Sequence, residues 1–122
     1  MIVGIGTDLI EIDRIVKACE NDAFLNKIYT ENEQKLAILD KNKLAGNFAV
    51  KEAIVKMIGT GFRGIKPIEV EVLRDELGKP FVNLYGGAKE QAKLLGITSI
   101  YVSITNVKEY ASAVAVGESL PG

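Results

Sequence analysis

Apolar residues are densest between Phe48 and Ile58, where only Lys51, Glu52 and Lys56 interrupt them. The stretch has no proline and is followed by glycine at position 59, where a left-handed cap would end a helix. It therefore predicts a central helix that is apolar on most sides and buried. Buried charge needs a partner. Glu52 and Lys56 lie one helical turn apart, a spacing that fits an ordinary i,i+4 ion pair on an exposed stripe as well as two groups of a binding site.

The N-terminal pattern predicts a short buried strand over residues 2–10. Gly4, Gly6 and Asp8 fall on one side of this strand by its period of two. Apolar residues then recur at the spacing of an amphipathic helix, at Ile12, Ile15, Val16 and Cys19. Asp8 is thus either the cap of this helix, a role that aspartate fills well, or a carboxylate presented at the end of a strand.

Two short helices are predicted before the central one. The first covers residues 22–29. The second begins with a T-x-x-E capping box formed by Thr30 and Glu33 and runs to about Leu39.

Alternating residues after the central helix predict a hairpin. Its first strand places Ile68, Val70 and Val72 inward and Glu69 and Glu71 outward, and its second strand covers residues 81–85 after a loop over 75–80. A helix over 88–95, capped by glycine at 96, and two strands near 100–105 and 110–116 complete the pattern. We predict an α+β domain over residues 1–117, with helices packed against a mostly antiparallel sheet, and a flexible tail over 118–122.

Composition excludes several classes of protein. The chain has 122 residues, a formal net charge of −1, one cysteine and no histidine. Histidine-dependent triads and zinc sites are therefore excluded, and a single cysteine provides no disulfide framework, which favours a reducing compartment. We expect a cytoplasmic protein that binds neither nucleic acid nor membrane, because there is no overall basic charge, no secretory leader and no apolar run of about 18 residues.

Charge is unevenly distributed around the central helix. Residues 41–66 carry six basic residues against Glu52 alone, and this excess favours a small anionic ligand or else a solvated basic face. The segment 59–64 spells GxGxxG, but it follows a predicted helix instead of a strand, so we do not interpret it as a dinucleotide site.

The remaining chemistry is that of oxygen ligands. Mg²⁺ is typically held by one or two carboxylates, with water and substrate phosphates completing its shell. Asp8 and Glu52 would provide such a pair if the fold brings them together, and Lys56 would meet a phosphate as a point charge.

Three motifs in order resemble the holo-[acyl-carrier-protein] synthases, the small 4′-phosphopantetheinyl transferases. They are G-I-G-T-D-L-I-E-I with Arg14 at residues 4–14, F-A-x-K-E-A-x-x-K with G-T-G at 48–61, and G-K-P at 78–80. The resemblance extends from residue 2 to about 116. It implies transfer of the 4′-phosphopantetheine of coenzyme A to a serine of acyl carrier protein, with release of adenosine 3′,5′-bisphosphate, in support of fatty acid biosynthesis.

The resemblance also implies roles for individual residues. Asp8 and Glu52 would hold Mg²⁺, with Mn²⁺ as an alternative, and Asp8, Glu52 and Lys56 would form the catalytic group. Arg14 and Lys17 would bind the carrier protein. Arg14 is the stronger candidate of the two, because it alone lies in the motif. Coenzyme A would contact Lys56, Gly59, Thr60, Gly61, Lys79 and Pro80. The family implies a homotrimer with sites between subunits.

One position departs from the family pattern. Many relatives have histidine where this chain has Asn106, which favours a base among the metal-site groups or water. Two other hypotheses remain open: a catalytically silent relative that binds coenzyme A or carrier protein, and a structural trimer in which Glu52 and Lys56 form an internal ion pair.

Overall fold

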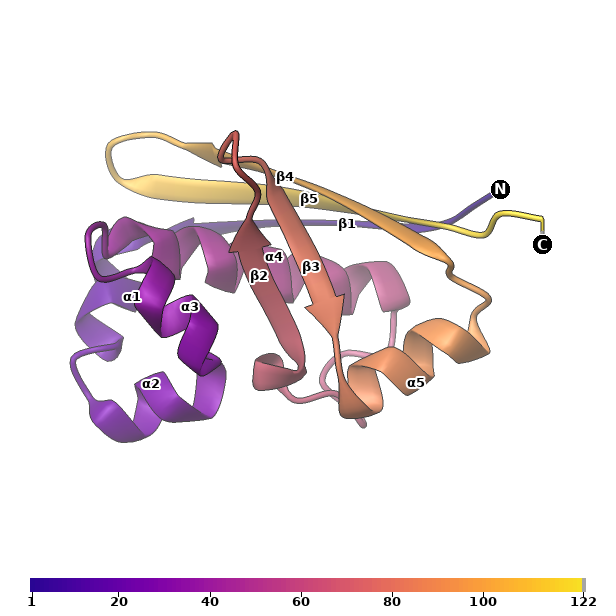
Figure 1. The fold of residues 1–122 in the computed structure, drawn as a ribbon, viewed down its shortest axis with the longest axis horizontal. Helices are drawn as coiled ribbons and strands as arrows, with labels where there is room; N and C mark the ends of the chain where they lie inside the picture. The colour runs from indigo at the N-terminus through magenta and orange to yellow at the C-terminus, as the bar shows by residue number, and fades with distance from the viewer. Residues whose placement is uncertain (122) are drawn as a thin grey trace.

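A 17-residue helix, α4 (Asn42–Ile58), lies at the centre of the computed structural model, which describes residues 1–121 (Figure 1). It is preceded by β1 (Ile2–Glu11), α1 (Ile12–Ala18), α2 (Asp22–Ile28) and α3 (Glu31–Leu36). It is followed by the 3₁₀ turn η1 (Pro67–Glu69), β2 (Val70–Arg74), β3 (Pro80–Leu84), α5 (Gly86–Leu94), β4 (Ser99–Asn106) and β5 (Tyr110–Glu118). The predicted α+β class with antiparallel strands is confirmed.

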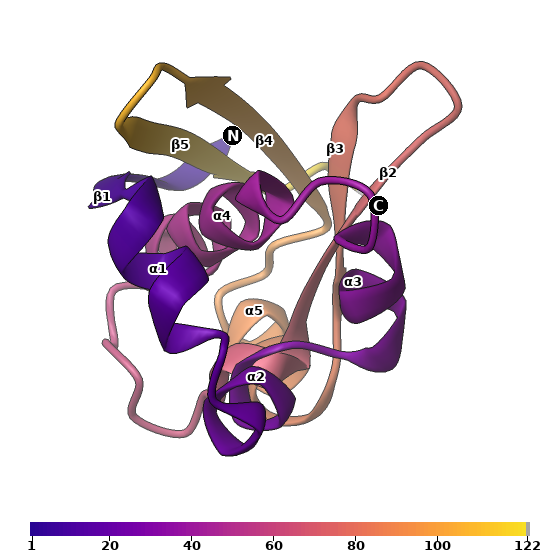
Figure 2. The same cartoon turned by 90° about the vertical axis from the view of Figure 1, so that its left-hand side faces the viewer.

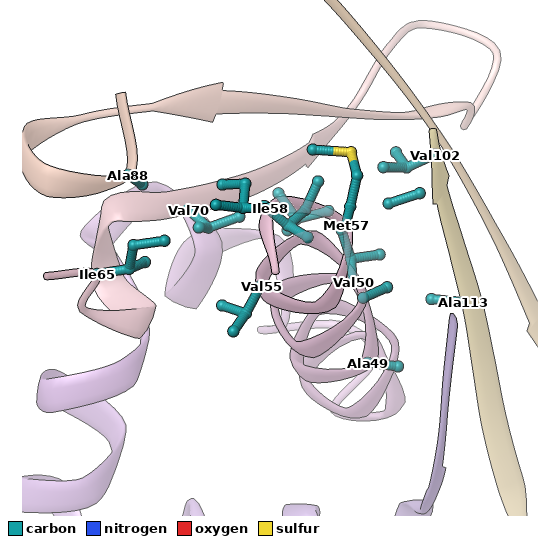
Figure 3. Packing of buried hydrophobic residues seen from close by; sticks show 14 residues of the cluster. Ala49, Val50, Val55, Met57, Ile58, Ile65, Val70, Ala88, Val102 and Ala113 are labelled. Carbon is teal, nitrogen blue, oxygen red and sulfur yellow. The ribbon is translucent and has the colours of Figure 1, made fainter. Parts of the chain in front are cut away.

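The larger sheet has the order β1-β5-β4, with both pairs antiparallel, and α4 packs along one face of it (Figure 2). Strand β5 turns only small side chains toward the helix, because Ala111, Ala113 and Ala115 are all buried. Small side chains let the helix and the sheet approach closely. The apolar core between them includes Val50, Met57 and Val102 (Figure 3).

Two glycines of β1 allow the closest contact between strand and helix. A Cβ atom at Gly6 would overlap the carbonyl oxygen of Ala53, and one at Gly4 would overlap the carbonyl oxygen of Met57. Any side chain at these positions would therefore push α4 away from β1. The glycines explain why the backbone of α4 runs directly beside the strand that carries Asp8.

Strands β2 and β3 form the predicted hairpin, with Val70 and Val72 fully buried. Two details of the prediction were wrong. The segment with Ile68 and Glu69 is a 3₁₀ turn instead of strand, and Glu71 is buried instead of solvent-facing. The burial of its carboxylate is compensated by hydrogen bonds from Thr30 Oγ1 at 2.6 Å, Asn83 Nδ2 at 3.2 Å and the Tyr85 hydroxyl at 3.2 Å.

The ends of the elements follow the sequence signals closely. The capping box at Thr30 and Glu33 is present, although α3 ends at Leu36 and is shorter than predicted. Gly59 ends α4 in the left-handed conformation with φ of 89°. Cys19 is buried and unpaired.

The predicted tail starts within β5, which extends to Glu118. The amide of Ser119 donates to the carbonyl oxygen of Met1 at 2.8 Å, and the amide of Leu120 donates to Thr98 Oγ1 at 2.9 Å. Residue 122 lies outside the described residues, and flexibility of the tail stays a prediction.

The face of the larger sheet that points away from α4 carries exposed apolar side chains. Ile5 and Leu9 on β1 are each 64% exposed, and Tyr101 on β4 is 53% exposed. Within residues 1–121, none of the helices covers this face (Figure 1). Within the same residues, no helix is both long and apolar enough to cross a membrane.

Candidate active site

The fold brings Asp8, Glu52 and Lys56 together, although Asp8 is more than 40 residues away from the other two in the sequence. Asp8 lies on β1 on the same side as Gly4 and Gly6, which face α4. The Lys56 ammonium donates to Asp8 Oδ1 at 3.0 Å. The Asp8 side chain is 15% exposed and the Lys56 side chain 55% exposed, so the pair lies at the protein surface.

Two alternative interpretations of these residues were wrong. Asp8 does not cap the first helix, because β1 continues to Glu11, which occupies the N-cap position without a side-chain hydrogen bond. The ion pair of Lys56 is made with Asp8 instead of with Glu52. The i,i+4 spacing of Glu52 and Lys56 therefore places both groups at one site without pairing them.

Glu52 is the second carboxylate of this site, and its side chain is partly buried. Partial burial and the negative charge of Asp8 raise the pKa of the Glu52 carboxyl above its ordinary value, while the Lys56 ammonium lowers it in part. Such an influence of Asp8 requires the two carboxylates to be near each other. Glu52 and Asp8 therefore lie close enough for their charges to interact.

The carboxylate pair fits a magnesium ion. Within residues 1–121 no group of three or more histidine, cysteine, aspartate or glutamate side chains is placed to hold a metal by itself. Mg²⁺ needs no such group, because it is commonly bound by one or two carboxylates and keeps water or phosphate oxygens as its other ligands. Asp8 and Glu52 offer hard oxygen donors, and Lys56 shows that a positive charge is accommodated beside Asp8.

A groove of about 500 Å³ lies next to Glu52 between β1, α1 and α4. Arg14 and Glu52 both line it, together with apolar and aromatic side chains: Leu9, Ile10, Ile15, Ala18, Phe24, Phe48 and Tyr110. The structure therefore brings Arg14 to the same groove as Glu52. Lys17 is exposed on α1 but does not line the groove. Phe24, Phe48 and Tyr110 were not predicted as site residues, since an aromatic residue in an apolar stripe looks the same in sequence whether it lines a core or a groove.

The predicted coenzyme A residues fall into two groups. Gly59, Thr60 and Gly61 follow directly on the helical turn that carries Lys56, and all three are exposed. Lys79 is exposed on the hairpin turn, and Gly78 and Pro80 line a separate hollow with Lys43, Arg74 and Asn106. This hollow shares no lining residue with the groove beside Glu52. Lys56, Gly59, Thr60 and Gly61 line neither the groove nor the hollow, so these depressions do not bring the two groups together.

The sequence analysis missed the most deeply buried charge. It looked for a partner of Glu52 and Lys56, but Lys51 is the buried lysine of α4, and its ammonium lies 2.8 Å from Glu33 Oε1 with side chains 1% and 0% exposed. The available signal was the position of Lys51 within the most apolar stretch of the chain, where Phe48, Ile54 and Val55 lie one turn away. Burial raises the pKa of Glu33 and lowers that of Lys51, and the attraction between the two charges opposes both shifts.

The chain is similar to known proteins along almost its whole length. The family model of the 4′-phosphopantetheinyl transferase superfamily matches residues 4–115. The holo-[acyl-carrier-protein] synthase of Lachnoclostridium phytofermentans is 65% identical over 118 residues, which cover 97% of both chains.

Solved structures show the same fold. The holo-[acyl-carrier-protein] synthase of Neisseria meningitidis matches with a TM-score of 0.87 and 32% identity over 98% of this chain and 100% of that one. The holo-(acyl-carrier-protein) synthase of Bacillus anthracis, solved in complex with CoA (3′,5′-ADP), matches with a TM-score of 0.80 and 36% identity over 98% of this chain and 99% of that one. From its motifs, its fold and these similarities, the chain belongs to the 4′-phosphopantetheinyl transferase superfamily.

Proposed function

We propose that this protein is a holo-[acyl-carrier-protein] synthase, which transfers the 4′-phosphopantetheine group of coenzyme A to a serine of apo acyl carrier protein in support of fatty acid biosynthesis. The observation that carries the proposal is the convergence of Asp8 and Glu52 beside Lys56. The products are holo acyl carrier protein and adenosine 3′,5′-bisphosphate.

Asp8 and Glu52 would hold Mg²⁺, or Mn²⁺ in its place, which supplies positive charge to the pyrophosphate of coenzyme A. The Lys56 ammonium has three donors and uses one on Asp8, so it would contact phosphate oxygens with the others. As the serine oxygen attacks the β-phosphorus, the bond to the leaving phosphate breaks, and Lys56 stabilises the charge that shifts onto the leaving group.

Glu52 would also help to remove the proton of the attacking serine, directly or through a water molecule. Its raised pKa makes it a stronger base than an ordinary glutamate, which favours proton acceptance near neutral pH. Asn106 is exposed and lies at the hollow beside Pro80 instead of the groove beside Glu52. We therefore assign Asn106 no role as a base.

The carrier protein would dock on α1 through Arg14 and Lys17. Arg14 lines the groove that also contains Glu52, so an acidic carrier bound to Arg14 would place its serine near the carboxylate pair. Lys17 lies on the same helix but outside the groove, so it would attract the acidic carrier protein by its charge without lining the groove itself.

The active form would be a homotrimer with its sites between subunits. The uncovered face of the larger sheet, with Ile5, Leu9 and Tyr101, supports this assembly, because an exposed apolar sheet face is typical of an interface. The hollow at Pro80 would then complete the coenzyme A site of a neighbouring copy, with Lys79 at its rim. Light scattering should give a mass three times that of one chain, and a monomer would contradict this part of the proposal.

The activity is tested by incubating the protein with coenzyme A, Mg²⁺ and apo acyl carrier protein. We expect the mass of the carrier to rise by that of the phosphopantetheine arm, and chelation of Mg²⁺ to prevent it. A carrier whose acceptor serine is replaced by alanine is the control. The proposal would be contradicted if the protein bound coenzyme A but transferred no phosphopantetheine to a carrier that another synthase modifies in parallel. That result would support a catalytically silent relative.

A further inference from the structure

Helix α4 is apolar on nearly all sides, so burial of its side chains does not by itself select one rotation about its axis. Buried residues occur in every turn: Leu44, Ala45, Gly46, Asn47, Ala49, Val50, Lys51, Ala53, Ile54, Val55, Met57 and Ile58. The hydrophobic effect has no direction. Cores of the right volume lose the uniqueness of their packing before they lose stability. A helix of this kind needs directional contacts, such as hydrogen bonds, to fix its rotation about its own axis.

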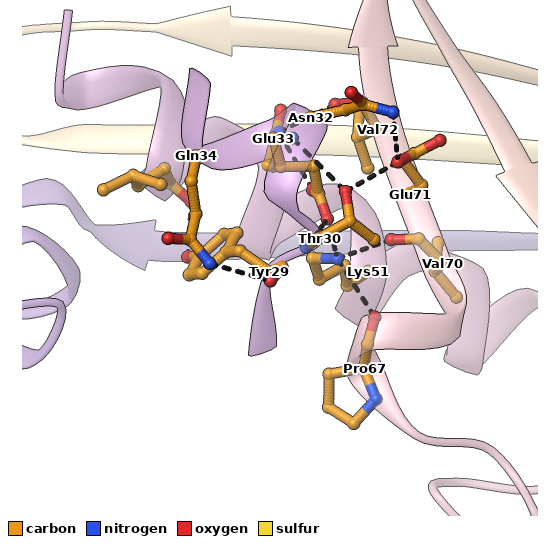
Figure 4. A network of polar contacts seen from close by, with 12 residues as sticks. Tyr29, Thr30, Asn32, Glu33, Gln34, Lys51, Pro67, Val70, Glu71 and Val72 are labelled. Atoms are coloured by element: carbon orange, nitrogen blue, oxygen red, sulfur yellow. Dashed lines mark hydrogen bonds and ion pairs between the residues drawn. The ribbon is translucent and has the colours of Figure 1, made fainter. Parts of the chain in front are cut away.

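Lys51 makes such directional contacts with three other segments. Its ammonium donates to Glu33 Oε1 on α3 at 2.8 Å, to the carbonyl oxygen of Pro67 in η1 at 3.0 Å, and to the carbonyl oxygen of Val70 on β2 (Figure 4). The three ammonium protons therefore all have acceptors. The ammonium also lies 5.4 Å from the centre of the Tyr29 ring.

Asn47, one turn earlier on the same side of α4, binds the same carboxylate. Its Nδ2 donates to Glu33 Oε2 at 3.0 Å and to the carbonyl oxygen of Val72 at 2.9 Å. Glu33 is itself fixed, because Oε1 accepts the amide of Thr30 at 3.1 Å in the capping box of α3. Both oxygens of this buried carboxylate are thus used to hold α4.

The direction of Lys51 determines the direction of Glu52. Consecutive residues of an α-helix point about 100° apart, so a helix fixed at Lys51 has no freedom to turn Glu52 away from Asp8. We propose that Glu33 and Lys51 are positioning residues, a buried ion pair that sets the rotation of α4 and so aims Glu52 and Lys56 at Asp8.

The physical balance of a buried ion pair suits this role. Removing two charges from water costs about as much as their attraction returns, so a buried pair adds little net stability over apolar residues of similar volume. Its best attested use is to specify one packing arrangement among several. The inference about catalysis rests on the proposed metal site, while the inference about helix rotation rests on the buried contacts alone.

The test replaces both charges at once, because a single replacement would leave the other charge buried without a partner. In the variant Glu33→Met/Lys51→Met, methyl NMR signals of Val50, Ile54 and Val55 report the packing of α4. We expect several sets or broadened signals where the wild type gives one. Titration with Mn²⁺, without coenzyme A, should show affinity at least about 10-fold weaker, comparable to the loss of residues that orient metal ligands elsewhere.

The control is Ile65→Ala, a core replacement that lowers stability and leaves both charges of the ion pair in place. It should keep one set of methyl signals and the wild-type Mn²⁺ affinity.

The proposal would be overturned by a double variant that shows either wild-type methyl spectra or wild-type Mn²⁺ affinity. If the double variant does not fold, Glu33→Gln/Lys51→Gln, which also removes both charges, takes its place, and failure of both to fold would also overturn the proposal, since the pair would then be needed for folding itself. Wild-type protein that binds no Mn²⁺ would contradict the metal site instead, and the methyl spectra alone would then decide the role of the pair.

Discussion

Helix α4 carries three lysine–carboxylate pairs, and the two that join it to distant segments, Lys51–Glu33 and Lys56–Asp8, differ in their surroundings. The pair Lys51–Glu33 has side chains 1% and 0% exposed and an ion-pair distance of 2.8 Å. The pair Lys56–Asp8 has side chains 55% and 15% exposed and a distance of 3.0 Å. In the first pair all three ammonium protons are bound within the protein, whereas Lys56 has one acceptor among the residues that the structure describes.

The two pairs contain the same types of charged group, so residue type does not tell the structural pair from the pair at the candidate binding site. They differ in how many hydrogen-bond donors of the lysine have no acceptor within the described part of the protein. The buried pair has no free donor, so it can only hold its neighbours. The surface pair leaves donors of Lys56 free and lies beside Glu52, whose pKa is raised by burial and by Asp8. A ligand with negative charge can therefore replace internal contacts of the second pair but not of the first.

The sharpest test of this difference replaces each lysine by methionine. Lys51→Met leaves Glu33 buried without its cation and should lower the free energy of unfolding by about 3–5 kcal/mol. Lys56→Met, the matched change in the exposed pair, should lower it by less than about 1 kcal/mol. Urea denaturation measures both. Equal losses would show that burial does not distinguish the two pairs.

Replacing Glu52 tests the functional side of the comparison. Glu52→Gln should reduce phosphopantetheine transfer by about 10²–10³-fold, a loss typical of a preorganised electrostatic group, because an amide is a poor magnesium ligand and no base. Circular dichroism should show an unchanged fold. Glu31→Gln, in the exposed pair of Glu31 with Lys35, is the control and should keep full activity. Transfer at the wild-type rate by the Glu52 variant would remove this residue from the mechanism.

The close approach of β1 to α4 can be weakened without changing any charge. Gly6→Ala places a Cβ against the backbone of Ala53, and relief of this overlap should cost about 1–3 kcal/mol of stability. It should also lower Mn²⁺ affinity, since Asp8 moves with the strand. Glu90→Ala, an exposed change on α5, should change the free energy of unfolding by no more than about 0.5 kcal/mol. Undiminished stability of the Gly6 variant would contradict the tight packing.

The smallest expected effect is on the titration of Glu52. A raised pKa means that Glu52 gains its proton at a higher pH than an ordinary glutamate, so metal binding should be lost as the pH falls through that raised value. Asp8→Asn removes a negative neighbour and should lower the pKa of Glu52, whereas Lys56→Met should raise it. Carbon NMR of the carboxyl group measures these shifts, and a midpoint that neither change moves would place Glu52 apart from both residues.

Much of the fold could be predicted because local signals agree with it. These signals are patterns of residues that are close in the sequence: the capping box at Thr30, the glycine that ends α4 and the alternation along the strands. Each depends on interactions within a few residues. The burial of Glu71 was missed, because alternation on a strand cannot show that a third element will cover the polar side with hydrogen-bond donors.

The sequence by itself determined the order of the helices and strands and their approximate positions, the apolar character of α4 and the candidates Asp8, Glu52 and Lys56. Only the tertiary structure decided which lysine is buried, which carboxylate each lysine meets and which aromatic residues line the groove. The reason is that backbone conformation follows from interactions between residues close in the chain. Ion pairing depends on contacts such as Asp8 with Lys56 and Glu33 with Lys51, which form only when separate segments pack together.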